Sequence, residues 1–89
     1  MEFEWNAQKN AANKKKHGVS FENAVLVFGD PMRLDVLDVE HSTREEERRI
    51  VLGKVDRVLY VVYTERKEVV RIISARVATA FERKVYYEI

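Results

Sequence analysis

The spacing of apolar residues at the start of the chain predicts a short strand followed by a helix. Residues 2–5 alternate between acidic and aromatic side chains, which is typical of a strand with one buried side. A helix is expected over Ala7–Lys16, because Asn6 can cap its first turn and consecutive lysines oppose the negative end of its dipole. Gly18 is the residue type at which helices commonly end.

A second helix is predicted after Ser20, whose hydroxyl can cap its first turn. The apolar positions that follow are separated by three or four residues and so fall on one side of a helix; they are Phe21, Ala24, Val25 and Phe28. Gly29 and Pro31 are expected to end this helix, since glycine favours a helix terminus and proline restricts the residue before it.

The middle of the chain predicts four strands that follow one another as an antiparallel meander. They are expected over residues 34–39, around 50–53, over 58–64 and over 69–74. Residues 58–64 are aromatic, aliphatic or β-branched throughout, so this strand should be covered on both faces and lie centrally. The short polar gap at 66–68 indicates a hairpin between the last two strands.

From Ala75 onward the spacing of apolar residues becomes helical, with Val77, Phe81 and Val85 four residues apart. This predicts a C-terminal helix that packs on the sheet. The fold class expected for the whole chain is therefore α+β, with an antiparallel sheet meander packed against two N-terminal helices and one C-terminal helix.

Composition narrows the class of protein. At 89 residues the chain is expected to form a single domain, residues 1–89, and 46% hydrophobic with 35% charged residues is typical of a folded domain. The absence of cysteine excludes disulfides, thiolate zinc sites and a cysteine nucleophile, and it suits the reducing cytoplasm. No signal peptide is expected, and the longest apolar run, Val58–Tyr63, is much shorter than a membrane span.

Several kinds of catalytic motif are absent from the sequence. It has no glycine-rich phosphate loop, no nucleophile elbow and no His-Glu-x-x-His motif. The acidic run Glu45-Glu46-Glu47 does not predict a cation site, because consecutive side chains point in different directions and Arg48 follows at once. We therefore expect no metal and no cofactor, and interpret this run mainly as a solvated loop.

The candidate chemistry lies in arginines around the predicted sheet. The formal net charge is only +1, so a nucleic-acid site depends on where these charges lie. Arg66 ends the central strand and Arg71 lies within the next one. Arg76 and Arg83 are seven residues apart on the predicted C-terminal helix, so they should share one face. If these side chains and Tyr87 converge on one concave surface, they can bind phosphates and stack on bases. The alternative is that each is a surface arginine paired with an acidic neighbour, namely Glu65, Glu68 or Glu82.

Three further residues have both a structural and a functional interpretation. Ser74 lies where the last strand is expected to pass into the C-terminal helix, so it can cap that helix or contact a phosphate. His17 follows three lysines at a helix end, where it can interact with the last helix carbonyls or donate to a phosphate. His41 can anchor its loop or act as an acid or base.

Several short segments, none specific alone, together form a highly specific pattern in their order and spacing. The first half contributes Phe3-Glu4-Trp5, Lys9, Asn13, Lys16-His17-Gly18-Val19-Ser20-Phe21-Glu22-Asn23-Ala24, Phe28-Gly29-Asp30-Pro31 and His41-Ser42. The second half contributes Glu46-Glu47-Arg48, Gly53, Val61-Val62-Tyr63-Thr64-Glu65-Arg66, Arg71-Ile72-Ile73-Ser74-Ala75-Arg76, Glu82-Arg83 and Tyr86. Through these segments the chain resembles the BrnT toxin family over almost its full length.

The resemblance implies a RelE-like fold and a ribonuclease activity that stops translation and growth. It also implies a BrnA-like antitoxin that neutralises the toxin and represses the shared operon, so that DNA is contacted only through the antitoxin complex. The chain departs from the family in one loop. Arg49 stands where the family commonly has an aromatic residue, and one extra residue separates His41 from Glu46.

The reaction implied by the resemblance is metal-independent RNA cleavage, in which the ribose 2′-hydroxyl attacks the adjacent phosphorus. Arg66 and Arg76 are expected to bind the phosphate and stabilise charge, with Arg83 assisting, because arginine keeps its proton at neutral pH. Glu47 and His41 are both candidates for the base, and Tyr86 can orient the nucleotide or relay a proton. Further RNA or phosphate contacts are expected from Arg71, Arg48, Lys16, His17 and Ser74.

Two other classes of function remain open from the residues. One is a non-catalytic RNA- or protein-binding module that uses a basic sheet face. The other is an interaction protein whose open sheet face or edge takes up a partner strand or helix. Both also describe the antitoxin-bound state of a toxin, so they are not strict alternatives to it.

Overall fold

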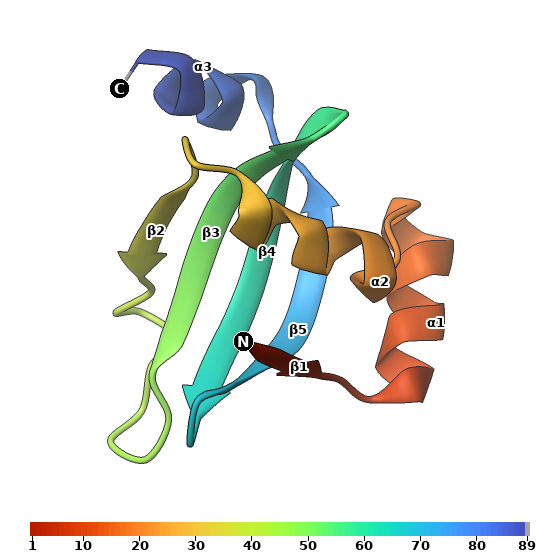
Figure 1. Cartoon of the computed structure of the whole chain (residues 1–89), viewed down its shortest axis with the longest axis vertical. Coiled ribbons are helices and arrows are strands. Elements are labelled where there is room, and N and C mark those ends of the chain that lie inside the picture. The colour runs from red at the N-terminus through yellow and green to blue at the C-terminus, as the bar shows by residue number, and fades with distance from the viewer. Residues whose placement is uncertain (89) are drawn as a thin grey trace.

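A five-stranded sheet forms the centre of the computed structural model, which describes residues 1–88 (Figure 1). In chain order the elements are β1 (Glu2–Glu4), α1 (Ala7–His17), α2 (Phe21–Ala24), the 3₁₀-helix η1 (Val25–Gly29), β2 (Leu34–Leu37), β3 (Arg48–Val55), β4 (Arg57–Arg66), β5 (Val69–Val77) and α3 (Ala80–Glu88). This order confirms the expected α+β class. The helices within residues 1–88 are too short or too polar to span a lipid bilayer.

The strands lie in the order β1-β5-β4-β3-β2. From β2 to β5, consecutive strands pair antiparallel, which confirms the predicted meander, and β4 is the central strand as predicted. β1 instead pairs parallel with β5, with Glu4 opposite Arg71, so the sheet as a whole is mixed.

The N-terminal helices begin and end close to their predicted limits. The Asn6 side chain accepts a hydrogen bond from the Lys9 backbone N–H at 3.0 Å, and Gly18 ends α1 in the left-handed region with φ of 72°. The second helix was expected to be one continuous α-helix, and this is wrong. It forms one α-helical turn and then tightens into η1, where β-branched Val25 and Val27 are less favourable to an α-helix.

The predicted start of the C-terminal helix at Ala75 is wrong, because β5 continues to Val77 and α3 begins at Ala80. Ala75 and Val77 pair with residues of β4, and these strand hydrogen bonds override the helical spacing of the side chains. Ser74 therefore lies within β5 and caps no helix. Thr79 caps α3 instead: its hydroxyl accepts from the Glu82 N–H at 3.2 Å, while the Glu82 carboxylate accepts from the Thr79 N–H at 2.9 Å.

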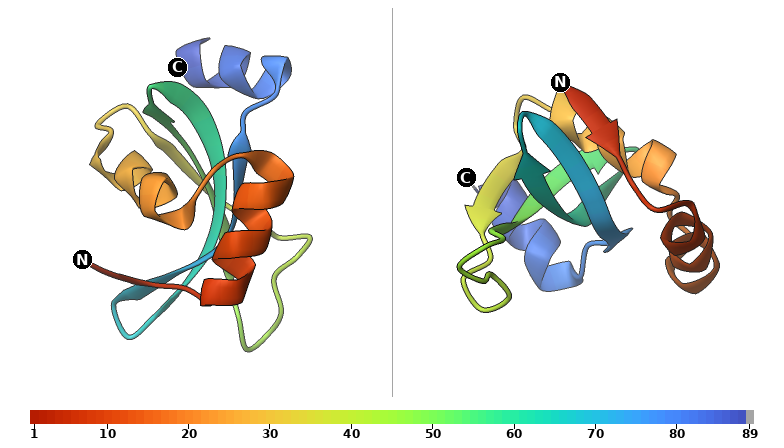
Figure 2. Two further views of the ribbon diagram at one scale, coloured as in Figure 1. Left: turned by 90° about the vertical axis from the view of Figure 1, so that its right-hand side faces the viewer. Right: turned by 90° about the horizontal axis from the view of Figure 1, so that it is seen from below.

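The two faces of the sheet have different roles. α2 and η1 cross one face over β3, β4 and β5 (Figures 1 and 2), and the main core lies beneath them, including Phe21, Val27, Val61 and Ile72. We call the opposite side the open face; α3 covers one end of it with Ala78 and Tyr86. Alternation along the strands assigns the following polar or charged residues to the open face: Arg48, Tyr60, Thr64, Arg66, Arg71, Ser74 and Arg76.

The outer edge of β5 is completed by a side chain rather than by a strand. β1 pairs with β5 only opposite residues 69–71. Further along β5, the buried Asn13 amide of α1 accepts from the Ala75 N–H at 3.2 Å and donates to the Ala75 carbonyl at 2.8 Å. It also donates to the Val19 carbonyl at 2.9 Å. Asn13 thus fixes α1 to β5 and satisfies backbone groups that a missing neighbour strand would leave unpaired.

Gly53 of β3 allows η1 to lie directly on the sheet, and this contact predicts the effect of a substitution. A methyl group at position 53 would lie 2.6 Å from Val27 Cβ and 3.0 Å from the Val27 carbonyl oxygen. We expect Gly53→Ala to lower the free energy of unfolding by about 1–3 kcal/mol through overpacking, as measured by urea denaturation. The control is Gly29→Ala, because a methyl group at exposed Gly29 meets no atom within 4 Å. Equal stability of the two variants would contradict this packing account.

Candidate functional site

The loop between β2 and β3 is held in a defined shape by two hydroxyls. Ser42 Oγ donates to the Asp38 carbonyl at 2.6 Å and accepts from the Arg48 N–H at 2.9 Å. Thr43 Oγ1 accepts from the Glu46 N–H at 3.0 Å, and the Thr43 N–H donates to the Glu46 carbonyl at 2.7 Å. These bonds close the loop and fix its side chains relative to β3.

His41 forms a pair with Asp38 in this loop. Its ring Nδ1 lies 2.9 Å from Asp38 Oδ2, and its backbone N–H donates to Asp38 Oδ1 at 3.3 Å. The Asp38 side chain is only 13% exposed, whereas that of His41 is 62% exposed. Because a carboxylate can only accept, the proton in this bond belongs to Nδ1, and in the neutral ring the lone pair then lies on Nε2. The pair therefore has the geometry of an oriented histidine at the surface.

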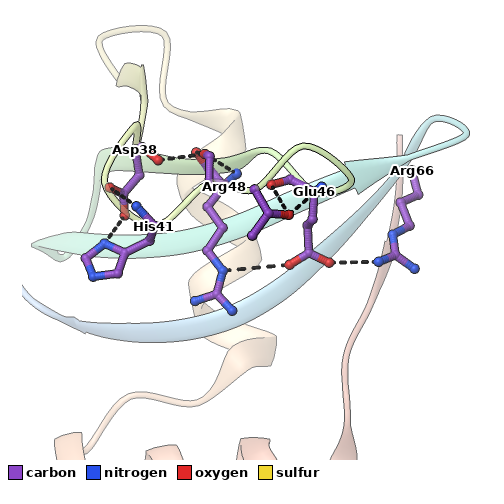
Figure 3. Close-up of polar contacts among 7 residues, drawn as sticks. Asp38, His41, Glu46, Arg48 and Arg66 are labelled. Atoms are coloured by element: carbon purple, nitrogen blue, oxygen red, sulfur yellow. Dashed lines mark hydrogen bonds and ion pairs between the residues drawn. The ribbon is translucent and has the colours of Figure 1, made fainter.

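Glu46 lies between two arginines on the same side of the sheet as His41 (Figure 3). Its Oε2 accepts from an Arg66 guanidinium nitrogen at 2.7 Å, and its Oε1 is 3.7 Å from Arg48 Nε. The Arg66 side chain is 70% exposed, so its guanidinium remains accessible to a ligand. Glu46 thus holds two guanidinium groups close together.

A third arginine belongs to the same end of the open face. Thr64 of β4 pairs with Arg48 on one side and with Arg71 on the other, so the three residues form a row across β3, β4 and β5. Arg71 in turn donates to Glu4 of β1 at 2.6 Å. We call Arg48, Arg66 and Arg71 the arginine corner. Thr64 is 1% exposed, and no group within residues 1–88 forms a hydrogen bond with its hydroxyl.

Arg76 lies at the other end of the sheet. It is opposite Tyr60 in the register and stacks on the Tyr60 ring at 3.9 Å. Its two terminal nitrogens donate to Glu82 at 2.8 and 3.0 Å, and this bidentate bond raises the pKa of Arg76 and lowers that of Glu82. Since Tyr60 and Arg66 are six residues apart on β4, Arg76 and Arg66 are separated by roughly 20 Å along the strand.

The expected convergence of four arginines and Tyr87 on one hollow is therefore wrong. Arg76 is on β5 and not on the C-terminal helix, so it does not share a helix face with Arg83. Arg83 donates to the Ala78 carbonyl at 3.2 Å, and Tyr87 lies beneath the Lys54 ammonium. Within residues 1–88, Glu82 is the one expected carboxylate partner that forms an ion pair with one of these arginines, and it pairs with Arg76. Arg66 pairs with Glu46 and Arg71 with Glu4.

Glu47 belongs to a different network from Glu46. It lies 3.4 Å from Arg49, which donates through Nε to Asp35 at 2.9 Å. Tyr63 also donates to Asp35, and burial together with this carboxylate raises the pKa of Tyr63 to about 12. Arg49 is thus paired with Asp35 and Glu47, away from the arginine corner.

Tyr86 belongs to α3, and its side chain is buried against the sheet at the end opposite the arginine corner. Its hydroxyl donates to Asp30, which also accepts from the backbone N–H groups of Met32 and Lys54. Burial first, and then Asp30, raise the pKa of Tyr86 to about 12. Burial acts to raise the pKa of Asp30, but the hydrogen bonds that its carboxylate accepts outweigh burial, and the pKa of Asp30 is lowered. Because its own pKa is raised, Tyr86 keeps its proton at neutral pH and anchors α3.

The structure brings Lys16, His17 and Ser74, each a predicted phosphate contact, together in one pocket. They line a pocket of about 240 Å³ between α1 and β5, whose full lining is Lys9, Ala12, Asn13, Lys16, His17, Ile73 and Ser74. Their role in binding RNA remains a prediction. A separate apolar groove of about 340 Å³ lies on the open face beside α3, lined mainly by Leu34, Val36, Ile50, Leu52, Tyr60, Phe81 and Val85.

The family described as the ribonuclease toxin BrnT of type II toxin-antitoxin systems matches residues 5–82 of the 89. The chain belongs to the BrnT toxin family. A comparison with curated proteins found no match. Membership confirms the resemblance seen in the sequence and indicates a ribonuclease toxin with an antitoxin partner and an RNA target.

Sequence reasoning missed Asp38, Glu46 and Lys9 as candidate site residues. The sequence analysis named Glu47 as a candidate base and gave Glu46 no role, although alternation in an extended segment places Glu46 on the side of Arg48 and Glu47 on the side of Arg49. Lys9 shares a helix face with Lys16, seven residues later, and this spacing was available in the sequence. Asp38 had no sequence signal beyond its closeness to His41.

The Tyr86–Asp30 bond predicts a specific pH dependence of stability. Because folding raises the pKa of Tyr86 from 10 to about 12, the stabilisation by its protonated form is complete below pH 10 and is lost as the pH rises to about 12. We expect the free energy of unfolding to fall over this range, and to fall less steeply in Tyr86→Phe, which retains the contributions of Tyr63 and Tyr60, whose pKa values are also raised. Urea denaturation at each pH measures both slopes, and identical slopes would refute the assignment.

Proposed function

We propose that this BrnT-family chain is a single-domain endoribonuclease with a RelE-like fold that cleaves RNA without a metal ion. In the cytoplasm it would inhibit translation and growth, and a BrnA-type antitoxin would neutralise it. DNA is contacted only through the antitoxin complex. The observation that carries the catalytic proposal is the alignment of the Asp38–His41 pair with Arg48, Glu46 and Arg66 on one side of the sheet (Figure 3).

The proposed reaction is an internal transfer at phosphorus. The ribose 2′-oxygen forms a bond with the adjacent phosphorus, its proton passes to a base, and the bond from phosphorus to the leaving 5′-oxygen breaks as that oxygen gains a proton. The products carry a 2′,3′-cyclic phosphate and a 5′-hydroxyl. The protein has to supply a base for the 2′ proton, an acid that gives a proton to the leaving 5′-oxygen, and cations that stabilise the charge developing on the phosphorane oxygens.

His41 is the better supported of the two candidate bases. Asp38 orients its ring through Nδ1, and Nε2 is left with a lone pair at an exposed surface. The competing candidate, Glu47, is occupied by Arg49 and lies apart from the arginine corner. In this proposal Asp38 is a positioning residue, because it acts through His41.

Arg48 and Arg66 are assigned to the scissile phosphate, with Arg71 beside them. The Glu46 carboxylate now occupies the space between Arg48 and Arg66, and it offers the same kind of acceptor as a phosphate. RNA binding would exchange the carboxylate for phosphate oxygens. Arg76 is about 20 Å away along β4, so it would contact a neighbouring part of the RNA, with Arg83 near it. For Tyr86 we propose an anchoring role.

The first test measures cleavage by purified variants in the presence of a chelator. His41→Ala and Arg66→Ala should each lower kcat/KM about 10²-fold or more, because each removes a group aimed at the transition state. The control Arg57→Ala removes an exposed arginine at the opposite end of β4 and should leave the rate unchanged. Product ends should be cyclic phosphates. Full activity of both site variants, or activity abolished by the chelator, would contradict the proposal.

A non-catalytic module that binds RNA or protein is the second candidate. It is favoured by the carboxylate partners of the arginine corner, since an acidic segment of another protein could take the same places. Inducing the chain alone in a bacterial host, and then with the adjacent gene, separates the two. We expect growth arrest that the neighbour relieves and that His41→Ala abolishes while RNA affinity persists. Arrest that survives His41→Ala at full strength would favour the binding module.

A further inference from the structure

The pocket between α1 and β5 gathers basic side chains that are not paired with carboxylates. Within residues 1–88, the side chains of Lys9, Lys16, His17 and Ser74 take part in no hydrogen bond or ion pair. The arginine corner differs, because Glu46 and Glu4 already pair with its members. The pocket therefore has free donors suited to an anion.

The spacing of residues on α1 builds this pocket. Lys9, Ala12 and Lys16 follow one another at three- and four-residue intervals, so they share one face of the helix, and the small Ala12 leaves room between the two lysines. The helix dipole does not explain this arrangement. Its negative end favours cations in the last turn only, whereas Lys9 lies in the first turn, where the dipole opposes it.

The floor of the pocket is held in place by buried contacts. Asn13 fixes α1 to Ala75 of β5 through two hydrogen bonds. Next to it the register of β5 shifts, with Ile72 opposite Tyr63 and Ser74 opposite Val62, so β5 has one extra residue here. Such a bulge re-aims side chains, and here Ile73 and Ser74 both face the pocket.

The position of the pocket relates it to the arginine corner. Ser74 is opposite Val62, which lies four residues before Arg66 on β4, or roughly 13 Å along the strand. The pocket and Arg66 thus lie at different positions along the sheet. We propose that Lys9, Lys16, His17 and Ser74 form a second subsite that binds a backbone phosphate flanking the scissile phosphate of the RNA. This inference rests on the proposed function.

The test uses two double variants of α1 that lose the same charge. Lys9→Ala/Lys16→Ala removes the pocket lysines, and the matched control Lys14→Ala/Lys15→Ala removes two lysines of the same helix that do not line the pocket. Binding is measured with a 2′-O-methyl oligoribonucleotide, which lacks the nucleophile and cannot be cleaved. We expect about tenfold weaker binding by the pocket variant than by the control. For the pocket variant, the slope of the logarithm of the binding constant against the logarithm of the salt concentration should also be smaller by about 0.7 for each lost phosphate contact.

Kinetics with two substrates give a second readout. For a long oligoribonucleotide, the pocket variant should have a higher KM and an unchanged kcat. For a dinucleoside monophosphate, which has no flanking phosphate, the pocket variant and the control should be equal. If wild type cleaves neither substrate yet RNA binding depends on the pocket lysines, the ribonuclease proposal fails and the subsite stands.

Two outcomes would overturn the subsite. The first is equal RNA affinity of the pocket variant and the control. The second is that inorganic phosphate alone shifts the His17 ring resonances in NMR spectra while RNA does not, which would assign the pocket to the free ion. We expect the oligoribonucleotide to shift the His17 signals in wild type, and this local effect to be lost in the pocket variant but kept in the control.

Discussion

The arrangement of the N-terminal half depends on the buried amide of Asn13. Its three hydrogen bonds to Ala75 and Val19 replace the strand that would otherwise lie beside β5, and they join α1, the following loop and the sheet at one point. An unpaired backbone group costs more than a hydrogen bond gains, so this side chain sets where α1 can lie. The lysine-bearing face of α1 is directed towards Ser74 as a consequence.

Alternation along β3 then separates structural from functional charges. Arg49 faces the covered side, where Asp35 and Tyr63 complete a partly buried network. Arg48, one residue earlier, faces the open side with Glu46 and Arg66. A shift of one residue in the register would exchange the two arginines and place the network on the open face. The bonds made by Ser42 and Thr43 close the preceding loop directly before β3.

Features decided by local sequence were predictable, and features decided by pairing were not. α1 and β4 were predicted because capping residues mark the first and a continuous apolar run marks the second. The end of β5 was missed because residues 75–77 have helical spacing, and only their partners on β4 keep them extended. The Thr79–Glu82 capping box does carry a local signal for the start of α3. The Asp38–His41 pair depends on loop geometry, which spacing does not encode, whereas alternation before β3 is enough to separate Glu46 from Glu47.

The distribution of paired and unpaired cations suggests how such a weakly charged chain can bind a polyanion. With a net charge of +1, the protein as a whole attracts RNA little. A phosphate that replaced Glu46 or Glu4 at the arginine corner would break the carboxylate contacts already made there, and this loss lowers its net contribution to affinity. In the proposed subsite the lysines of α1 have, within the described part of the chain, no carboxylate contact to give up. Under this proposal most of the RNA affinity comes from the pocket. Arg48 and Arg66 bind in place of Glu46 only a phosphate that is correctly placed between them.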